Sequence, residues 1–286
     1  MRDAYRPACH ACVSALRSGV MATAEDTGTA ATVELSDEQL AHYRSQGFVV
    51  IENLVSPAEL SALQERLREY THGGRSQERL RVQIEPRVTR GELNVEHPGD
   101  GIRKIDGLVE SDDLYQALGR HPNIVGVLAR ILGPDLKMFR NGVLLKPPEV
   151  GSAKGMHQDS PYWPIRPMEL CSCWFAIDEA TVENGCMGVI AGAHLDGALP
   201  HVHVTDDYVI PPEHYAAAAK TLAPMPAGAG LFFHSLLPHA TEPNRSHKWR
   251  RAIALSYMSA RSTHTDPGGG PVYFPIAGAT YPGCVK

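Results

Sequence analysis

Residues 155–164 contain a histidine and a carboxylate two positions apart, in the stretch Gly155-Met156-His157-Gln158-Asp159-Ser160-Pro161-Tyr162-Trp163-Pro164. In an extended chain alternate side chains share one face, so His157 and Asp159 are predicted to converge on one point. The same His-x-Asp pattern recurs at His194-Leu195-Asp196. We expect one of the two copies to be structural, and the rest of the chain to decide which.

An imidazole and a carboxylate on one face supply two of the three ligands of a common metal site. A second histidine from elsewhere would complete a set of two histidines and one carboxylate. Three such ligands on one side of an octahedral metal leave positions open, as in non-haem iron(II) centres. Residues 228–244 offer two candidates for the third ligand, His234 and His239. The residues alone leave both candidates open.

A predicted strand at residues 250–257 separates two kinds of side chain. On one face Arg250 lies among small residues, and on the other Arg251 is followed by large apolar residues. The first face suits a cavity and the second suits core packing. A guanidinium in a cavity can grip a carboxylate with two parallel hydrogen bonds. The alternative is an arginine of an edge strand that points into solvent.

The composition is that of an ordinary globular protein. The chain has 286 residues, of which 43% are hydrophobic and 21% charged, and this predicts one large domain. A net charge of −5 gives no basic footprint for nucleic acid. No apolar run is long enough to cross a bilayer. The six cysteines form no disulfide framework, so we expect a cytoplasmic protein without nucleic-acid or membrane partners.

The N-terminal part is predicted to contain a tail followed by helices. Residues 1–34 have no periodic apolar face, so we expect a disordered tail, with Met21 as an alternative start. Order is predicted to begin at the capping box Ser36-Asp37-Glu38-Gln39. Further helices are predicted after Ser56-Pro57 and over residues 122–132.

Strands are predicted mainly in the second half of the chain. A short strand is expected at 48–51, and residues 73–107 are expected to be irregular, with one strand-like piece at 102–105. Beyond Leu136, short apolar runs are separated by glycine and proline, which favours a sandwich or small barrel; these runs lie at 143–146, 170–177, 187–190, 231–233 and 250–257.

The expected fold is α+β with a β-rich core. We predict a double-stranded β-helix, the cupin-like jelly roll, over residues 35–286, braced by N-terminal α-helices. Residues 195–223 are too long for a hairpin connection. They are therefore expected to form an insert that acts as a lid. The sequence makes no prediction for the oligomeric state.

A series of short motifs occurs in a fixed order along residues 36–262. With these motifs the chain resembles the phytanoyl-CoA dioxygenase family of Fe(II)- and 2-oxoglutarate-dependent oxygenases, and their joint order carries the likeness. The motifs are Lys146-Pro147-Pro148, His157-Gln158-Asp159, Trp174, Glu183-Asn184-Gly185-Cys186-Met187, Ala191-Gly192-Ala193-His194, Phe232-Phe233-His234 to His239, and Asn244-Arg245-Ser246 to Arg250-Arg251-Ala252-Ile253.

The resemblance assigns roles to particular residues. It implies that the iron ligands are His157, Asp159 and His239, which makes His194 and Asp196 the structural copy and His234 a packed histidine. Arg250 follows His239 by 11 positions, a spacing similar to that of the family's arginine for the distal carboxylate of 2-oxoglutarate. The resemblance further implies that the cosubstrate pocket includes Thr241, Lys104 and Trp174.

The reaction that the resemblance implies uses Fe(II), 2-oxoglutarate and O2. The expected outcome is hydroxylation of an unactivated C–H bond of a small-molecule metabolite, with release of succinate and CO2. A carboxylate at Asp159 favours hydroxylation over halogenation, because related halogenases carry a small residue there.

Two other functions fit part of the same pattern. A zinc-dependent hydrolase could use the same His/Asp/His set, but it leaves Arg250, Thr241 and Lys104 unexplained. A non-catalytic jelly-roll binding module would use the histidines only as satisfied polar groups.

Substrate contacts are expected from residues 75–103, from Tyr162 and Trp163, and from residues 201–215. The arginines of the first segment suggest an anionic substrate, and solvated surface charge is the alternative that we favour.

Overall fold

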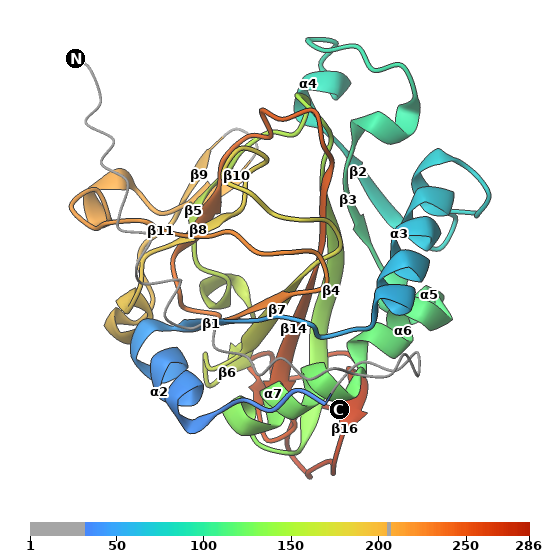
Figure 1. The fold of residues 1–286 in the computed structure, drawn as a ribbon. Helices are drawn as coiled ribbons and strands as arrows, with labels where there is room; N and C mark the ends of the chain where they lie inside the picture. The colour runs from blue at the N-terminus through green and yellow to red at the C-terminus, as the bar shows by residue number, and fades with distance from the viewer. Residues whose placement is uncertain (1–31, 205–206) are drawn as a thin grey trace.

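The computed structural model describes residues 32–204 and 207–286. Most of the predicted tail, including the alternative start at Met21, lies outside the described residues. Within the described part, antiparallel sheets form a double-stranded β-helix, and helices lie on one side of it (Figure 1). The predicted fold class is thereby confirmed. None of the described helices is long and apolar enough to cross a membrane.

The larger sheet forms the wall against which the helices pack. Its strands are, in spatial order, β1 (Phe48–Ile51), β12 (Gly230–His234), β7 (Cys171–Ala176), β14 (Arg250–Ser259), β4 (Leu136–Lys146), β3 (Ile102–Asp106) and β2 (Arg81–Ile84), with β16 (Phe274–Ala277) beside β4.

The smaller sheet carries the residues of main interest. Its order is β11 (Thr221–Ala223), β8 (Met187–Val189), β13 (His239–Thr241) and β5 (Lys154–His157). Two short pairs complete the described strands, β9 (Val202–Val204) with β10 (Asp207–Val209) and β6 (Ile165–Arg166) with β15 (Thr263–His264). The predicted insert at 195–223 therefore includes β9 and β10, and also β11, which pairs with β8. Its role as a lid stays a prediction.

The predicted helices and strands are present, and the structure adds several short elements. The helices are α2 (Asp37–Gln46), α3 (Pro57–His72), α4 (Pro86–Thr89), α5 (Leu108–Ser111), α6 (Asp113–Gly119) and α7 (Pro122–Leu132). Capping boxes at Ser36 and Ser56 begin α2 and α3, as expected. The prediction of a single strand within residues 73–107 was wrong, because β2 is also a strand. Its side chains are mostly exposed, so no apolar alternation marks it.

Alternating side chains of the larger sheet serve two separate cores. In β7, Cys173 and Phe175 pack toward the helices, whereas Trp174 and Ala176 point into the space between the sheets. Strand β14 follows the same alternation, since Ile253 and its like-facing neighbours join the helix-side core. Residues of opposite parity on these strands are therefore available to line an internal cavity.

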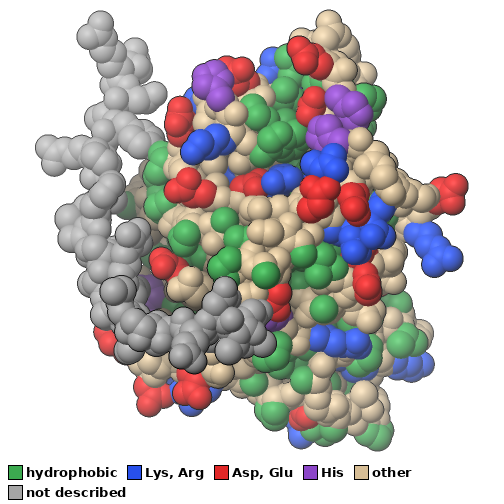
Figure 2. Space-filling model, turned by 45° about the vertical axis from the view of Figure 1, so that its right-hand side comes forward, with side chains coloured by type: hydrophobic (Ala, Val, Ile, Leu, Met, Phe, Trp, Pro, Cys, Tyr) green, Lys and Arg blue, Asp and Glu red, His purple; other side chains and the backbone are tan. Residues whose placement is uncertain are grey.

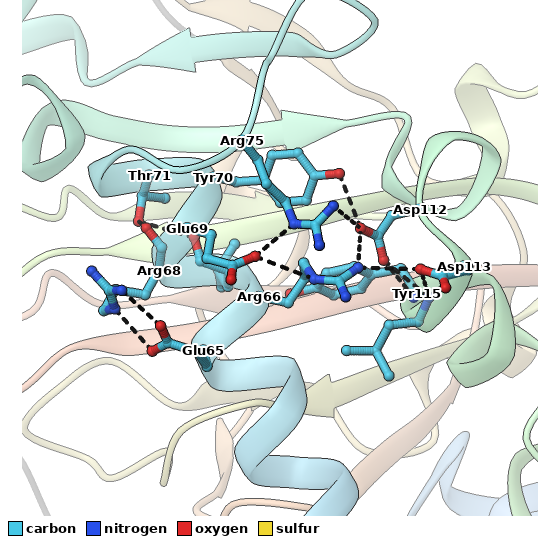
Figure 3. A network of polar contacts seen from close by, with 12 residues as sticks. Glu65, Arg66, Arg68, Glu69, Tyr70, Thr71, Arg75, Asp112, Asp113 and Tyr115 are labelled. Carbon is cyan, nitrogen blue, oxygen red and sulfur yellow. Dashed lines mark hydrogen bonds and ion pairs between the residues drawn. The ribbon is translucent and has the colours of Figure 1, made fainter.

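A buried carboxylate connects helix α3 to helix α6. Asp112, the N-cap of α6, accepts a hydrogen bond from Arg66 Nη1 at 2.6 Å and from the Tyr70 hydroxyl at 3.0 Å. Figure 3 shows Arg75 approaching the same carboxylate, at 3.9 Å. This network joins α3, the segment that follows it and the start of α6.

Candidate metal centre

Two histidines from paired strands lie next to one carboxylate. His157 at the end of β5 is in register with His239 at the start of β13, and their ring centroids are 4.1 Å apart. Asp159 Oδ1 lies 3.9 Å from His157 Nε2. The ligand atoms of the three residues all lie within 4.8 Å of one another. No other group of this kind occurs among residues 32–204 and 207–286.

The path of the chain to Asp159 differs from the sequence prediction. An extended strand through both residues was expected, but β5 ends at His157 and Asp159 has helical dihedrals, φ −83° and ψ −52°. The backbone N–H groups of Asp159 and Ser160 both donate to Ser235 O, at 2.9 and 3.0 Å. This turn, rather than strand alternation, brings the carboxylate to the histidines.

The tautomers of both histidines are set by backbone carbonyls. His157 Nδ1 lies 2.9 Å from Gly155 O, and His239 Nδ1 lies 2.9 Å from Leu237 O. Because a carbonyl only accepts, each Nδ1 carries the proton and each Nε2 keeps a lone pair for a metal. Burial, followed by the nearby charges of His239 and Lys154, lowers the pKa of His157 well below its ordinary value. Two imidazoles that bind through Nε2 and one carboxylate suit Fe(II).

Arg250 is a buried cation whose hydrogen bonding is incomplete. Its residue is 2% exposed, and Nε has no hydrogen-bond partner among the described residues. Nη1 reaches Leu144 O only at 3.5 Å, and the guanidinium lies 5.1 Å from the Trp174 ring centroid. Burial lowers the pKa of Arg250 to about 10, so it stays charged at neutral pH. An unpaired buried charge is unfavourable, and an anionic ligand would satisfy it.

One cavity of about 620 Å³ joins these features. The structure brings all seven site residues expected from the sequence to its wall: His157, Asp159, His239, Arg250, Thr241, Lys104 and Trp174. The Lys104 ammonium is paired with Asp106 Oδ1 at 2.7 Å, and burial lowers its pKa. The three segments expected to contact substrate also reach this cavity, through Arg103, Tyr162, Trp163, His203 and Tyr208 among others.

The second His-x-Asp copy lies away from this site. His194 is buried, and its Nε2 lies 3.2 Å from Arg44 O. His234 Nδ1 accepts a hydrogen bond from the Leu236 N–H at 3.1 Å. The rings of His194 and His234 are 5.2 Å apart, and neither residue belongs to the group of three metal ligands.

Sequence reasoning missed the residue between two of the ligands. Gln158 is fully buried, and its amide donates to Gly197 O at 2.8 Å and to Leu236 O at 2.6 Å. Its Oε1 accepts from the Leu199 N–H at 2.8 Å. Through these hydrogen bonds Gln158 connects the end of β5 to the insert and to the loop that precedes His239. A polar residue between two ligands was the only signal in the sequence.

Comparisons of the sequence with known proteins find matches described as phytanoyl-CoA dioxygenases. A family model described as phytanoyl-CoA dioxygenase matches residues 43–252. A Caenorhabditis elegans protein named probable phytanoyl-CoA dioxygenase is 28% identical over 79% of this chain and 76% of its own length. The human peroxisomal phytanoyl-CoA dioxygenase is 27% identical over 82% of this chain and 72% of its own length.

Solved structures share the fold. The non-haem α-ketoglutarate-dependent carbocyclase SnoK has a TM-score of 0.66 at 22% identity, covering 86% of this chain and 100% of its own. The non-haem monooxygenase ThoJ has a TM-score of 0.65 at 26% identity, covering 86% of each chain. The epimerase SnoN, solved with Fe³⁺, α-ketoglutarate and nogalamycin RO, has a TM-score of 0.64 at 21% identity and covers 87% of this chain and 97% of its own.

Proposed function

Because this chain belongs to the phytanoyl-CoA dioxygenase family, whose model matches residues 43–252, we propose that it hydroxylates an unactivated C–H bond of a small-molecule substrate. The chain is a non-haem oxygenase that uses iron and 2-oxoglutarate. The proposal concerns the reaction outcome and the roles of the individual side chains.

The proposed iron ligands are Nε2 of His157, a carboxylate oxygen of Asp159 and Nε2 of His239. Their Nδ1 hydrogen bonds to Gly155 O and Leu237 O hold both rings in the orientation and tautomer that a metal requires. Asp159 supplies the single negative charge of the set. A zinc hydrolase could use the same three ligands, but it would have no use for a buried guanidinium in the same cavity.

Arg250 is proposed to bind the distal carboxylate of 2-oxoglutarate. The proposal rests on the Nε–H of Arg250. This group has no hydrogen-bond partner among the described residues, and Arg250 lines the same cavity as the three ligands. Thr241 lies on β13 two residues after His239 and lines the same cavity, where its hydroxyl could donate to that carboxylate. Lys104 and Trp174 are proposed to form further parts of the wall around the cosubstrate.

Bound iron and 2-oxoglutarate together supply the oxidising power that activates O2. In the balanced reaction, R–H, 2-oxoglutarate and O2 give R–OH, succinate and CO2, so one oxygen atom enters each organic product. The residues of this chain orient the two small molecules and exclude water from the space between the sheets. Asp159 would fill the metal position that a halide would need, which favours hydroxylation.

A screen of metabolites under ¹⁸O2 tests the proposed outcome. A substrate should stimulate succinate release, and its product should gain one labelled oxygen atom. A substrate that stimulates succinate release but loses two hydrogens without gaining oxygen would contradict hydroxylation. The Asp159→Ala variant should release no succinate above background, whereas Asp196→Ala, in the second His-x-Asp copy, should match wild type.

We also propose a cytoplasmic location from the cysteines. The described cysteines, Cys171, Cys173, Cys186 and Cys284, are free, which suits a reducing compartment. The human relative is named peroxisomal, so the location needs a test by fractionation of cells that express this chain. Recovery of the protein in a membrane-bounded organelle would contradict the proposal.

A further inference from the structure

The floor of the cavity is a ladder of paired residues on β4 and β14. At one end Arg250 faces Lys146, and at the other end Ser256 faces Arg140. The ends are six positions apart on each strand, which corresponds to roughly 20 Å of extended chain. The residues of the ladder between them that line the cavity are small or apolar: Gly142, Leu144, Leu145 and Ala254. The two arginines therefore mark opposite ends of one elongated cavity.

Arg140 is an exposed side chain that also lines the cavity, and no described side chain balances its charge. Six lysines and arginines but only three carboxylates line the cavity. Lys104 is paired with Asp106, and Lys154 with Asp207. Arg140 has neither a hydrogen bond nor an ion pair with any residue in the described part of the chain; its contact is the Trp163 ring, 5.8 Å from the guanidinium.

The positive charges that line the cavity contribute to lowering the pKa values of two nearby lysines. Burial, followed by the charge of Arg103, lowers the pKa of Lys154 to about 8, and Lys104 and Arg140 contribute. Burial and then the charge of Arg140 likewise lower the pKa of Lys104. Elsewhere, basic and acidic side chains are intermingled on the face shown in Figure 2. The excess of basic over acidic side chains is found among the residues that line the cavity.

Three aromatic side chains, Tyr162, Trp163 and Tyr208, line the same cavity as Arg140, and Trp163 lies beside its guanidinium. Trp163 packs against Phe139 with a centroid distance of 4.7 Å, and Tyr162 meets Tyr208 edge to face at 5.0 Å. Tyr162 and Tyr208 line the cavity while remaining 40% and 47% exposed. Large aromatic surfaces at a cavity entrance suit a flat apolar ligand. A guanidinium over an aromatic ring keeps its N–H edge free for a carboxylate.

We propose that the substrate is an acid with a planar apolar body, whose carboxylate binds Arg140 while its body lies against the Tyr162, Trp163 and Tyr208 side chains. This inference rests on the proposed function, because it requires 2-oxoglutarate at the Arg250 end. The carboxylate then lies far from Arg250, and the bond to be oxidised lies nearer the metal. A cavity of about 620 Å³ that also contains 2-oxoglutarate leaves space for a compact acid.

The test compares 2-naphthoate with its neutral analogue 2-naphthamide. Calorimetric titrations are made without oxygen on protein loaded with Fe(II) and saturating 2-oxoglutarate, which keeps the probe carboxylate away from Arg250. Wild type should bind the acid about tenfold more tightly than the amide, because the acid gains a charged hydrogen bond. In Arg140→Gln this ratio should fall below about twofold, with unchanged 2-oxoglutarate affinity.

The matched control is Arg261→Gln, since Arg261 also stacks on an aromatic ring, that of Tyr281, at 3.7 Å, but does not line the cavity. It should keep the wild-type ratio. Three results would each overturn the proposal. They are equal affinities for acid and amide in wild type, binding of neither probe, and a preference for the acid that survives in Arg140→Gln. Binding of 2-naphthoyl-CoA but not of the free acid would also overturn it, because the recognised anion would then be a phosphate. Loss of the Fe(II)–2-oxoglutarate absorption band in wild type would instead refute the proposed function, so the two failures are distinguishable.

Discussion

Arg250 and Arg251 are adjacent in the sequence but serve opposite faces of β14. Arg250 lines the cavity, whereas Arg251 forms a two-point ion pair with Asp178, at 2.7 and 2.8 Å. This division follows from strand alternation, and the small residues that share a face with Arg250 made it predictable. The pair also provides a comparison of two arginines one position apart, Arg250 buried and Arg251 partly exposed.

Arg250→Gln should weaken 2-oxoglutarate binding by about 100-fold, because removing one partner of a buried charge pair leaves the other unpaired. Fe(II) binding should be retained, since no metal ligand changes. Equilibrium titration of both ligands measures this. Arg251→Gln should keep the 2-oxoglutarate affinity and lower the melting temperature. Equal 2-oxoglutarate affinity in wild type, Arg250→Gln and Arg251→Gln would refute the role of Arg250.

Lys146 faces Arg250 across the same ladder and makes stability depend on pH. Burial, followed by the charge of Arg250, lowers the pKa of Lys146 from 10.5 to about 6. Its amine donates to Ser152 O at 2.7 Å and to Glu242 O. Between pH 6 and 10.5 the unfolded chain binds a proton that the folded chain does not. The contribution of Lys146 to stability therefore becomes more favourable as pH rises through this interval.

Lys146→Met should remove this dependence. Between pH 6.5 and 9 the free energy of unfolding of wild type should rise relative to the variant, by up to about 1.4 kcal/mol per pH unit. Urea denaturation of both proteins across that range measures the difference. A difference that stays constant with pH would show that Lys146 is charged in the folded protein.

Among the strands, those with runs of buried apolar residues were predictable from the sequence, whereas exposed strands and turns were not. Strands β7, β12 and β14 occur close to the expected positions because their buried residues form regular apolar runs. Strand β2 was missed because it is largely exposed. The turn at Asp159 was missed because its hydrogen bonds go to Ser235 O, on a distant segment that no local pattern reveals.

Helix α6 offers a prediction about the layer that braces the larger sheet. Asp112 and Asp113 both pair with Arg66, but their side chains are 1% and 94% exposed (Figure 3). Asp112→Ala should lower the free energy of unfolding by about 3 kcal/mol, because Arg66 and Tyr70 lose a buried partner and α6 loses its cap. Asp113→Ala should leave the denaturation midpoint nearly unchanged. Equal effects of the two substitutions would contradict the structural role of the buried carboxylate.

At the scale of the whole molecule, the two sheets contribute different parts of the site. The smaller sheet and the turn after β5 provide the group of three ligands, and the larger sheet provides Arg250. Composition and alternation predicted a jelly roll with a candidate metal pair, but they left His234 and His239 equivalent. The order of motifs along the chain favoured His239, and of these two histidines the structure places His239 beside His157. The substrate has no comparable motif, because its contacts are proposed to come from three irregular segments.

The central claim is that His157, Asp159 and His239 hold iron in the same cavity in which Arg250 anchors 2-oxoglutarate. It is tested most directly by anaerobic titration of the protein with Fe(II) and 2-oxoglutarate, followed by visible absorption. Wild type and His234→Ala should both develop the weak charge-transfer band of the chelated cosubstrate, and His239→Ala should not. The absence of the band in wild type, or its survival in His239→Ala, would contradict the account.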